Sequence, residues 1–309
     1  GGRRVTTAVV VARDGRLVAE RYAPGYGPDA PMLSWSMAKS VLATLVGLAI
    51  EEERLALDAS GVAPEWRGAA DARRFVTLDQ MLRMSSGLHF DETYGPTSEA
   101  SVMLFARPEA AAYAAAMPLA APPDSVWSYS SGTSNLLARA LRESFAGDTL
   151  ALLDWADQRL FSPAGITTAL LETDAGGNLL ASSFVYMTAR DWARFGELHR
   201  LKGRAQGRRV LPEGWVDYVT TPTPASHGEY GAHWWLNRGQ AEAPDTPTWP
   251  ALPRDTYAAR GHNGQYVVVV PSEKLVVVRL GLTTPDGGHD GAAELVADVI
   301  RAYRQRRTP

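Results

Sequence analysis

The stretch "LSWSMAKSVLATLVGLAIEEE", from Leu33 to Glu53, decides how the rest of the chain is interpreted. It places a hydroxyl at Ser36 and an amine at Lys39, at the start of an apolar run that predicts a buried helix. Residues three apart lie on one face of a helix, so both side chains are expected to leave its first turn in the same direction.

A lysine is poorly suited to the first turn of a helix, where unpaired N–H groups create a positive potential. This potential and burial both lower the pKa of an amine from its reference value of roughly 10.4. A neutral amine can then accept the proton of a neighbouring serine hydroxyl. Ser36 and Lys39 therefore predict a nucleophile and its base. The alternative is a chance Ser-x-x-Lys in which the serine only caps the helix.

A second stretch, "VWSYSSGTSNLLARAL" from Val126 to Leu141, carries Tyr129 just before a predicted helix over Thr133–Phe145. A tyrosine at such a junction can project its phenol into a cleft. Near Lys39, that phenol could carry a proton between nucleophile and leaving group. The alternative is a core tyrosine followed by a serine-rich cap.

A third stretch, "ARGHNGQYVVVVP" from Ala259 to Pro271, precedes and includes a strongly β-forming segment. Gly264 lets another backbone or a substrate approach closely. The backbone N–H of Gln265 could then join that of Ser36 as a two-donor oxyanion hole. The alternative is a turn before a strand, with a partly buried histidine.

Composition excludes several classes of function. The chain has 309 residues, 45% hydrophobic and 21% charged, as in ordinary globular proteins. A net charge of −3 argues against nucleic acid as a partner. No uncharged apolar run reaches the roughly 18 residues of a membrane span. Cysteine is absent, and the histidines show no metal-binding spacing, so we predict neither a metal nor a cofactor.

Predicted strands occur at both ends of the chain, with helices between them. Asp14 and Gly15 mark a hairpin turn near the N-terminus, and the segment 85–101 is predicted to be a long loop. Strands at both ends can pair into one antiparallel sheet that helices must cover. The prediction is an α/β (α+β) fold: an antiparallel sheet from both chain ends, flanked by helices, with an inserted all-helical lobe. The expected domains are a sheet domain of residues 1–58 and 185–309 and a helical domain of residues 59–184.

These three stretches, in this order, resemble the serine β-lactamase-like, or penicillin-recognising, superfamily. Its members include class C β-lactamases, D-alanyl-D-alanine peptidases, family VIII carboxylesterases and 6-aminohexanoate-dimer hydrolases. The resemblance covers nearly the whole chain and extends to further segments: "VTLDQMLRMSSGL" (Val76–Leu88), "RLFSPAGIT" (Arg159–Thr167), "MTARDWARFGELHRLKGRAQGRRVLPEGWV" (Met187–Val216) and "YGAHWWLN" (Tyr230–Asn237).

The resemblance implies that Ser36 is the nucleophile, Lys39 its base and Tyr129 the tyrosine of the second motif. It also implies an oxyanion hole from the N–H groups of Ser36 and Gln265. Residues expected to bind substrate are Ser131, His262, Asn263 and Gly264 from the motifs, and Trp127, Trp234, Trp235 and Tyr94 from neighbouring segments.

Two departures from the family pattern bear on substrate. Ser131 stands where lactamases carry an asparagine, and His262 replaces a lysine. A neutral histidine holds an anionic substrate less firmly than a permanent cation does. We therefore expect a bacterial esterase or small-amide hydrolase, close in motif to 6-aminohexanoate-dimer hydrolases. A β-lactamase or D-alanyl-D-alanine carboxypeptidase, and a catalytically silent binding module, are the alternatives. Localisation, cytoplasmic or periplasmic/secreted, and oligomeric state stay open.

Overall fold

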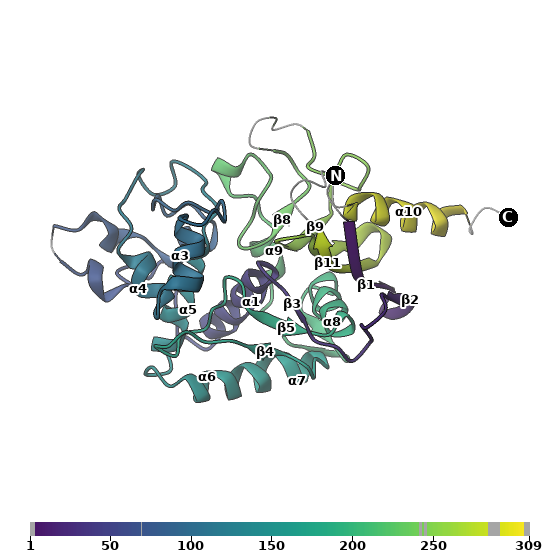
Figure 1. The fold of residues 1–309 in the computed structure, drawn as a ribbon, viewed down its shortest axis with the longest axis horizontal. Coiled ribbons are helices and arrows are strands. Elements are labelled where there is room, and N and C mark those ends of the chain that lie inside the picture. The colour runs from purple at the N-terminus through teal and green to yellow at the C-terminus, as the bar shows by residue number, and fades with distance from the viewer. Residues whose placement is uncertain (1–3, 69, 241–242, 244–245, 284–290, 306–309) are drawn as a thin grey trace.

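A six-stranded antiparallel sheet forms the centre of the fold. The computed structural model describes residues 4–68, 70–240, 243, 246–283 and 291–305. The strand order is β2-β1-β11-β10-β9-β8, with bounds β1 Arg4–Arg13, β2 Arg16–Tyr22, β8 Trp235–Leu236, β9 Tyr257–Gly261, β10 Gln265–Val270 and β11 Leu275–Thr283. β1 pairs antiparallel with β11, so strands from the two chain ends lie side by side (Figure 1). The predicted sheet is thereby confirmed.

Helices cover both faces of this sheet, as predicted. Alternate residues of β10 point to opposite faces: Val267 and Val269 join the main core, and Val268 and Val270 join a second one. Helix α8 (Ala189–Arg200) packs on the first face, and α10 (Ala292–Gln305) supplies Val296 and Ile300 to the second.

Helix α1 (Met37–Glu51) runs through the middle of the molecule (Figure 1), and every residue from Met37 to Ala49 is buried. The predicted helix is confirmed, and its all-round apolar surface explains its central place. The ring of Trp215 packs directly against the backbone of α1 at Gly47, where an added Cβ would lie only 2.3 Å from a ring atom.

We expect Gly47→Ala to destabilise the protein. Alanine normally favours a helix over glycine by about 1 kcal/mol. Here its methyl would overlap the Trp215 ring, and overpacking a core typically costs about 1–3 kcal/mol. Urea denaturation should therefore show a lower free energy of unfolding, whereas Gly68→Ala, at a position with no neighbouring atoms within 4 Å, should leave it unchanged. A more stable Gly47→Ala protein would contradict the packing described.

Helices dominate the chain between α1 and β5 (Val185–Met187): η1 Pro64–Trp66, η2 Ala72–Phe75, α2 Leu78–Leu82, α3 Glu99–Ala106, α4 Ala110–Ala115, α5 Ser131–Glu143, α6 Thr149–Ala156, η3 Asp157–Phe161 and α7 Ser162–Ala164. Thr77 and Gln80 form a capping box at the start of α2. The prediction of a loop over 85–101 is wrong at its end, because Ser98 caps α3 by accepting from the Ser101 N–H. The helical domain of residues 59–184 stays a prediction.

Short strands hold the segment that leads into α1. β3 (Met32–Leu33) pairs with β5, which also pairs with β4 (Leu170–Leu171). The Ser34 N–H donates to the Val185 carbonyl at 2.9 Å, so the chain just before Ser36 is fixed from outside the helix. The remaining elements are β6 Arg204–Ala205, β7 Arg208–Arg209, α9 Trp215–Val219, η4 Pro224–Ser226 and η5 Pro271–Glu273.

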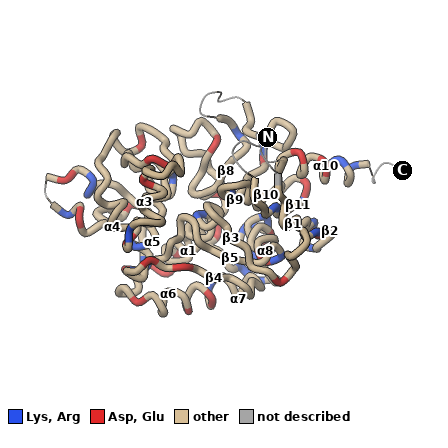
Figure 2. The backbone as a smooth tube through the Cα atoms, in the orientation of Figure 1, with Lys and Arg blue, Asp and Glu red and all other residues tan. Residues whose placement is uncertain are grey.

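Acidic and basic residues are interspersed along the described chain (Figure 2). This distribution agrees with the small net charge of −3. In the part of the chain that the structure describes, no helix is long and apolar enough to cross a membrane.

Candidate active site

Ser36 occupies the N-cap position of α1 but does not cap it with its side chain. The preceding residue, Trp35, has a φ of 47°, a left-handed conformation that is uncommon for a bulky residue. Such backbone geometry concentrates at functional sites. Ser36 is 8% exposed and is therefore largely buried, but it lines a cavity that is described below.

Lys39 is 1% exposed and its amine is surrounded by oxygen atoms. Its Nζ lies 3.1 Å from the Ser36 Oγ, 2.9 Å from the Ser131 Oγ and 3.0 Å from the Ser182 carbonyl. Burial lowers the pKa of this lysine to about 8, against an opposing effect of the Glu92 charge. The amine is thus within reach of the serine proton, and its neutral form becomes the major one above about pH 8.

The Ser131 hydroxyl lies between this amine and a carboxylate. Ser131 is the first residue of α5, and Glu92 accepts both its N–H, at 2.7 Å, and its hydroxyl proton, at 2.5 Å. A carboxylate at a helix N-terminus is also favoured by the unpaired N–H groups there. Ser131 was expected to contact substrate; in the structure it connects Glu92 with Lys39.

Tyr129 lies beside the same amine, with its ring centroid 4.8 Å from the Lys39 Nζ. Its ring is held by Trp235 and Tyr230, with centroids 5.2 and 5.8 Å away. Burial raises the pKa of Tyr129 well above its ordinary value, although an interaction with Ser36 opposes this. The phenol therefore keeps its proton at neutral pH and can donate it.

The third predicted segment, Ala259–Pro271, belongs to the central sheet and approaches the backbone of Ser36. Gly261 on β9 pairs with Gln265 on β10, and a Cβ added to Gly261 would lie only 2.2 Å from the Ser34 carbonyl oxygen and 3.2 Å from the Ser36 nitrogen. Only a glycine permits this approach. The Gln265 side chain is bound to the Gly281 carbonyl at 2.5 Å, and Gln265 is not among the residues that line the cavity at Ser36, whereas Gly261 and His262 are. The Gln265 N–H as an oxyanion donor stays a prediction.

Tyr94 and His262 are aromatic residues that line the cavity beside Ser36. The rings of Tyr94 and His262 stack with centroids 4.9 Å apart, and His262 also meets the ring of Trp35 at 5.2 Å. Burial lowers the pKa of His262, so the imidazole is neutral. Burial raises the pKa of Tyr94 to about 12, although interactions of its hydroxyl with Ser131, Ser183 and Ser36 oppose this.

These residues enclose a cavity of about 360 Å³. It is lined by Ser36, Glu92, Thr93, Tyr94, Tyr129, Trp235, Arg260, Gly261, His262, Asn263, Gly264, Tyr266 and Thr283. The structure therefore brings together residues from all three sequence stretches and from the loop before α3.

Two of the predicted pocket residues lie elsewhere. Trp234 is fully buried and packs against Phe195 and Tyr257 in the core. Trp127 packs on Tyr230 and Trp235 behind the cavity wall. Neither lines the cavity, and we do not retain them as substrate contacts.

Sequence reasoning missed several residues of this region. Glu92 and Arg260 line the cavity, as do Thr93, Gly261, Tyr266 and Thr283, and the Ser182 carbonyl binds Lys39. Glu92 lies two residues from Tyr94 in the loop that the sequence marked as functional, which was a usable signal. No sequence signal pointed to Arg260 or Ser182. Arg260 lines the cavity because of where the edge of its strand lies, and Ser182 acts through its backbone carbonyl.

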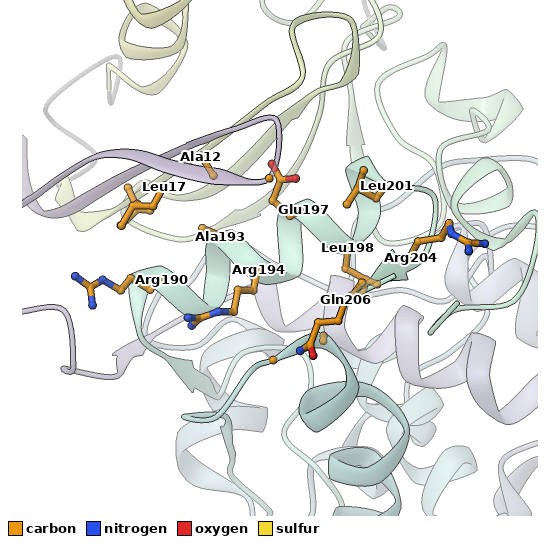
Figure 3. A pocket seen from close by; sticks show the side chains of 15 residues that line it. Ala12, Leu17, Arg190, Ala193, Arg194, Glu197, Leu198, Leu201, Arg204 and Gln206 are labelled. Atoms are coloured by element: carbon orange, nitrogen blue, oxygen red, sulfur yellow. The ribbon is translucent and has the colours of Figure 1, made fainter. Parts of the chain in front are cut away.

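A second cavity, of about 350 Å³, lies between the β1–β2 hairpin, α8 and the β6–β7 turn. Figure 3 shows arginine and aliphatic side chains of α8 around it. Arg190 is paired with Glu20, and Arg194 with Asp191. Its described lining contains neither a serine nor a lysine, so the chemistry discussed here belongs to the cavity at Ser36.

Comparison with known proteins identifies the family of the chain. The model of the family described as Beta-lactamase matches residues 1–300. The chain belongs to the beta-lactamase family. The resemblance predicted from its three motifs is confirmed.

Relatives of this beta-lactamase family chain include a 6-aminohexanoate-dimer hydrolase of Paenarthrobacter ureafaciens. That protein is 27% identical over 335 residues, covering 96% of this chain and 78% of the relative. Among solved structures, EstCE1, a hydrolase with promiscuous acyltransferase activity, has a TM-score of 0.74 at 17% identity, covering 96% and 93% of the two chains. A D-stereospecific amidohydrolase from Streptomyces has a TM-score of 0.66 at 18% identity, covering 95% and 94%. These two structures share the fold.

Proposed function

We propose that the protein is a serine hydrolase of the beta-lactamase superfamily that forms an acyl-enzyme on Ser36 and hydrolyses an ester or small amide. One observation carries the proposal: a buried amine, with its pKa lowered to about 8, lies 3.1 Å from the Ser36 hydroxyl. Burying a lysine costs free energy, and here the buried amine is placed to accept a serine proton.

In the proposed mechanism, Lys39 takes the proton of Ser36 as its Oγ attacks the carbonyl carbon. The N–H groups of Ser36 and Gln265 would receive the oxyanion. The proton passes through Lys39 and Tyr129 to the leaving alcohol or amine, whose bond to the carbonyl carbon breaks. Water then attacks the acyl-enzyme, the same groups act in reverse, and the acid and free Ser36 are released.

Charged and aromatic side chains both line the cavity, and Arg260 and Glu92 are the charged residues in its described lining. His262 is neutral because burial lowers its pKa, so it offers no permanent cation to a carboxylate. The rings of Tyr94, Trp235 and Tyr266 line the same cavity. The relative named 6-aminohexanoate-dimer hydrolase supports a linear amide, and the fold shared with EstCE1 is compatible with an ester.

A panel of p-nitrophenyl esters, linear amides such as the 6-aminohexanoate dimer, and nitrocefin tests this assignment. We expect turnover of short acyl esters or linear amides with kcat/KM well above that for nitrocefin. Efficient nitrocefin hydrolysis without ester or amide turnover would instead identify a β-lactamase.

A non-catalytic relative that keeps the fold is the second candidate. It is less well supported, because the Ser36 hydroxyl, the Lys39 amine and the Tyr129 side chain lie close together, as a hydrolase requires. A fluorophosphonate probe separates the two: a hydrolase should be labelled stoichiometrically on Ser36, and a silent module should not.

Activity should rise with pH through the range in which the Lys39 amine loses its proton. Burial lowers the pKa of Lys39 to about 8, and only the neutral form accepts the Ser36 proton. Below this pH, kcat/KM should increase about tenfold per pH unit, and above it the rate should level off. A profile of kcat/KM between about pH 6 and about pH 10 measures this; a rate that falls with pH over this range would exclude Lys39 as the base.

A further inference from the structure

The hydrogen bonds of Glu92 fix the direction of the Ser131 hydroxyl. One carboxylate oxygen accepts the Ser131 N–H at 2.7 Å, and the other accepts its hydroxyl proton at 2.5 Å. An ionised carboxylate has no proton to give. The single proton of Ser131 is therefore committed to Glu92, and its oxygen can only accept from Lys39.

The hydrogen bonds of Lys39 then follow from counting donors. A neutral amine has two N–H donors and one lone pair. Two of its three neighbours can only accept: the Ser131 Oγ at 2.9 Å, as just argued, and the Ser182 carbonyl at 3.0 Å. Both N–H groups are thus used, and the lone pair faces the third neighbour, the Ser36 hydroxyl at 3.1 Å.

We propose that Glu92 is a positioning residue for the base: through Ser131 it turns the lone pair of the neutral Lys39 amine toward Ser36. This inference rests on the proposed serine hydrolase mechanism and adds a residue to it. No hydrogen bond of the described residues joins Glu92 to Lys39 or Ser36, so its positioning effect passes through the Ser131 hydroxyl.

Glu92→Gln reverses this arrangement with almost no change in shape. The Ser131 N–H can only donate, so it retains the amide oxygen of the new side chain and places the NH₂ group against the Ser131 Oγ. Ser131 then accepts from Gln and is free to donate its proton to the Lys39 lone pair. An N–H of Lys39 is left facing Ser36, where it cannot accept the serine proton.

The charge of Glu92 has an effect of opposite sign. It raises the pKa of Lys39 against the larger effect of burial, so its removal should lower that pKa and populate the neutral amine at lower pH. If charge alone mattered, Glu92→Gln would be more active near pH 7. The proposal predicts instead that the acidic limb of the profile moves to lower pH while the plateau falls.

Glu92 also has a structural role, because it accepts the Ser131 N–H at the N-terminus of α5. Glu99 provides a matched control. It accepts the Asp91 N–H at 2.9 Å in the same loop region, yet no hydrogen bond of the described residues connects it to Lys39.

The experiment measures the pH dependence of ester kcat/KM and of fluorophosphonate labelling for the full chain and its variants. For Glu92→Gln we expect a plateau at least about tenfold lower, a part of the roughly 10²–10⁴-fold that a general base contributes, and an acidic limb at lower pH. Glu92→Asp, which can only accept, should recover part of the loss. Glu99→Gln should match the unmodified protein in both readouts, and thermal unfolding reports whether each variant is folded.

A double-mutant cycle tests the path through Ser131. Once Ser131→Ala has removed the hydroxyl, adding Glu92→Gln should change the plateau by less than about twofold. A plateau retained in Glu92→Gln, or a loss that persists undiminished on the Ser131→Ala background, would overturn the inference. Ser36→Ala, run in parallel, separates this failure from that of the proposed function: activity independent of Ser36 would refute the hydrolase mechanism itself.

Discussion

Ser36→Ala should abolish hydrolysis, with kcat reduced by roughly 10⁴-fold or more, the scale seen when a covalent nucleophile is removed. The reason is that no acyl-enzyme can form without the Oγ that Lys39 faces at 3.1 Å. Initial rates on the best substrate of the ester and amide panel, and mass-spectrometric detection of the acyl or phosphonyl adduct, measure the loss.

Ser36 makes no cap to α1, so its replacement should leave the fold intact. A far-UV spectrum and melting temperature close to those of the unmodified protein provide the control. Ser34→Ala is unsuitable as a control for Ser36→Ala, because the Ser34 hydroxyl donates to the Trp35 and Ser183 carbonyls and its loss would disturb the local structure. Undiminished turnover by folded Ser36→Ala protein would end the proposed function.

Lys39→Met should lower kcat/KM by about 10²–10⁴-fold, the typical contribution of a positioned general base. Methionine fills a similar volume in this 1% exposed site but has no lone pair of comparable basicity to accept the Ser36 proton. The pH dependence attributed to the amine should disappear at the same time, because the group that titrates near pH 8 is gone.

Lys202 offers a control for this substitution. It lies on the surface, where it pairs with Asp217, and Lys202→Met should retain full activity and the same pH profile. If Lys39→Met kept a profile rising through pH 8, another group would have to be the base.

The local parts of this fold could be predicted from the sequence. The apolar run after Ser36 predicts a central helix, Asp14 and Gly15 predict a hairpin, and Thr77 predicts a helix start. Each depends on residues within a few positions of one another. Helix α3 was missed because its cap, Ser98, follows a stretch rich in glycine and proline that also fits a loop.

The site could be predicted only where it is local or carries a motif. Ser36 and Lys39 are neighbours on one helix turn, whereas Glu92 meets Ser131 across 39 positions of sequence. That contact depends on how the loop before α3 packs on α5, which no local pattern encodes. Neighbouring residues of an extended segment face opposite sides, so only one of Trp234 and Trp235 could reach the cavity, and the sequence did not indicate which.

The pairing of β1 with β11 has a consequence for synthesis of the protein. The partner of the first strand is Leu275–Thr283, so on the ribosome β1 must wait until most of the chain has emerged. Contacts this distant in sequence close slowly, and an exposed strand edge invites association with other chains in the interval. Production of soluble protein should therefore benefit from slow translation at low temperature or from chaperones that shield the nascent N-terminal hairpin.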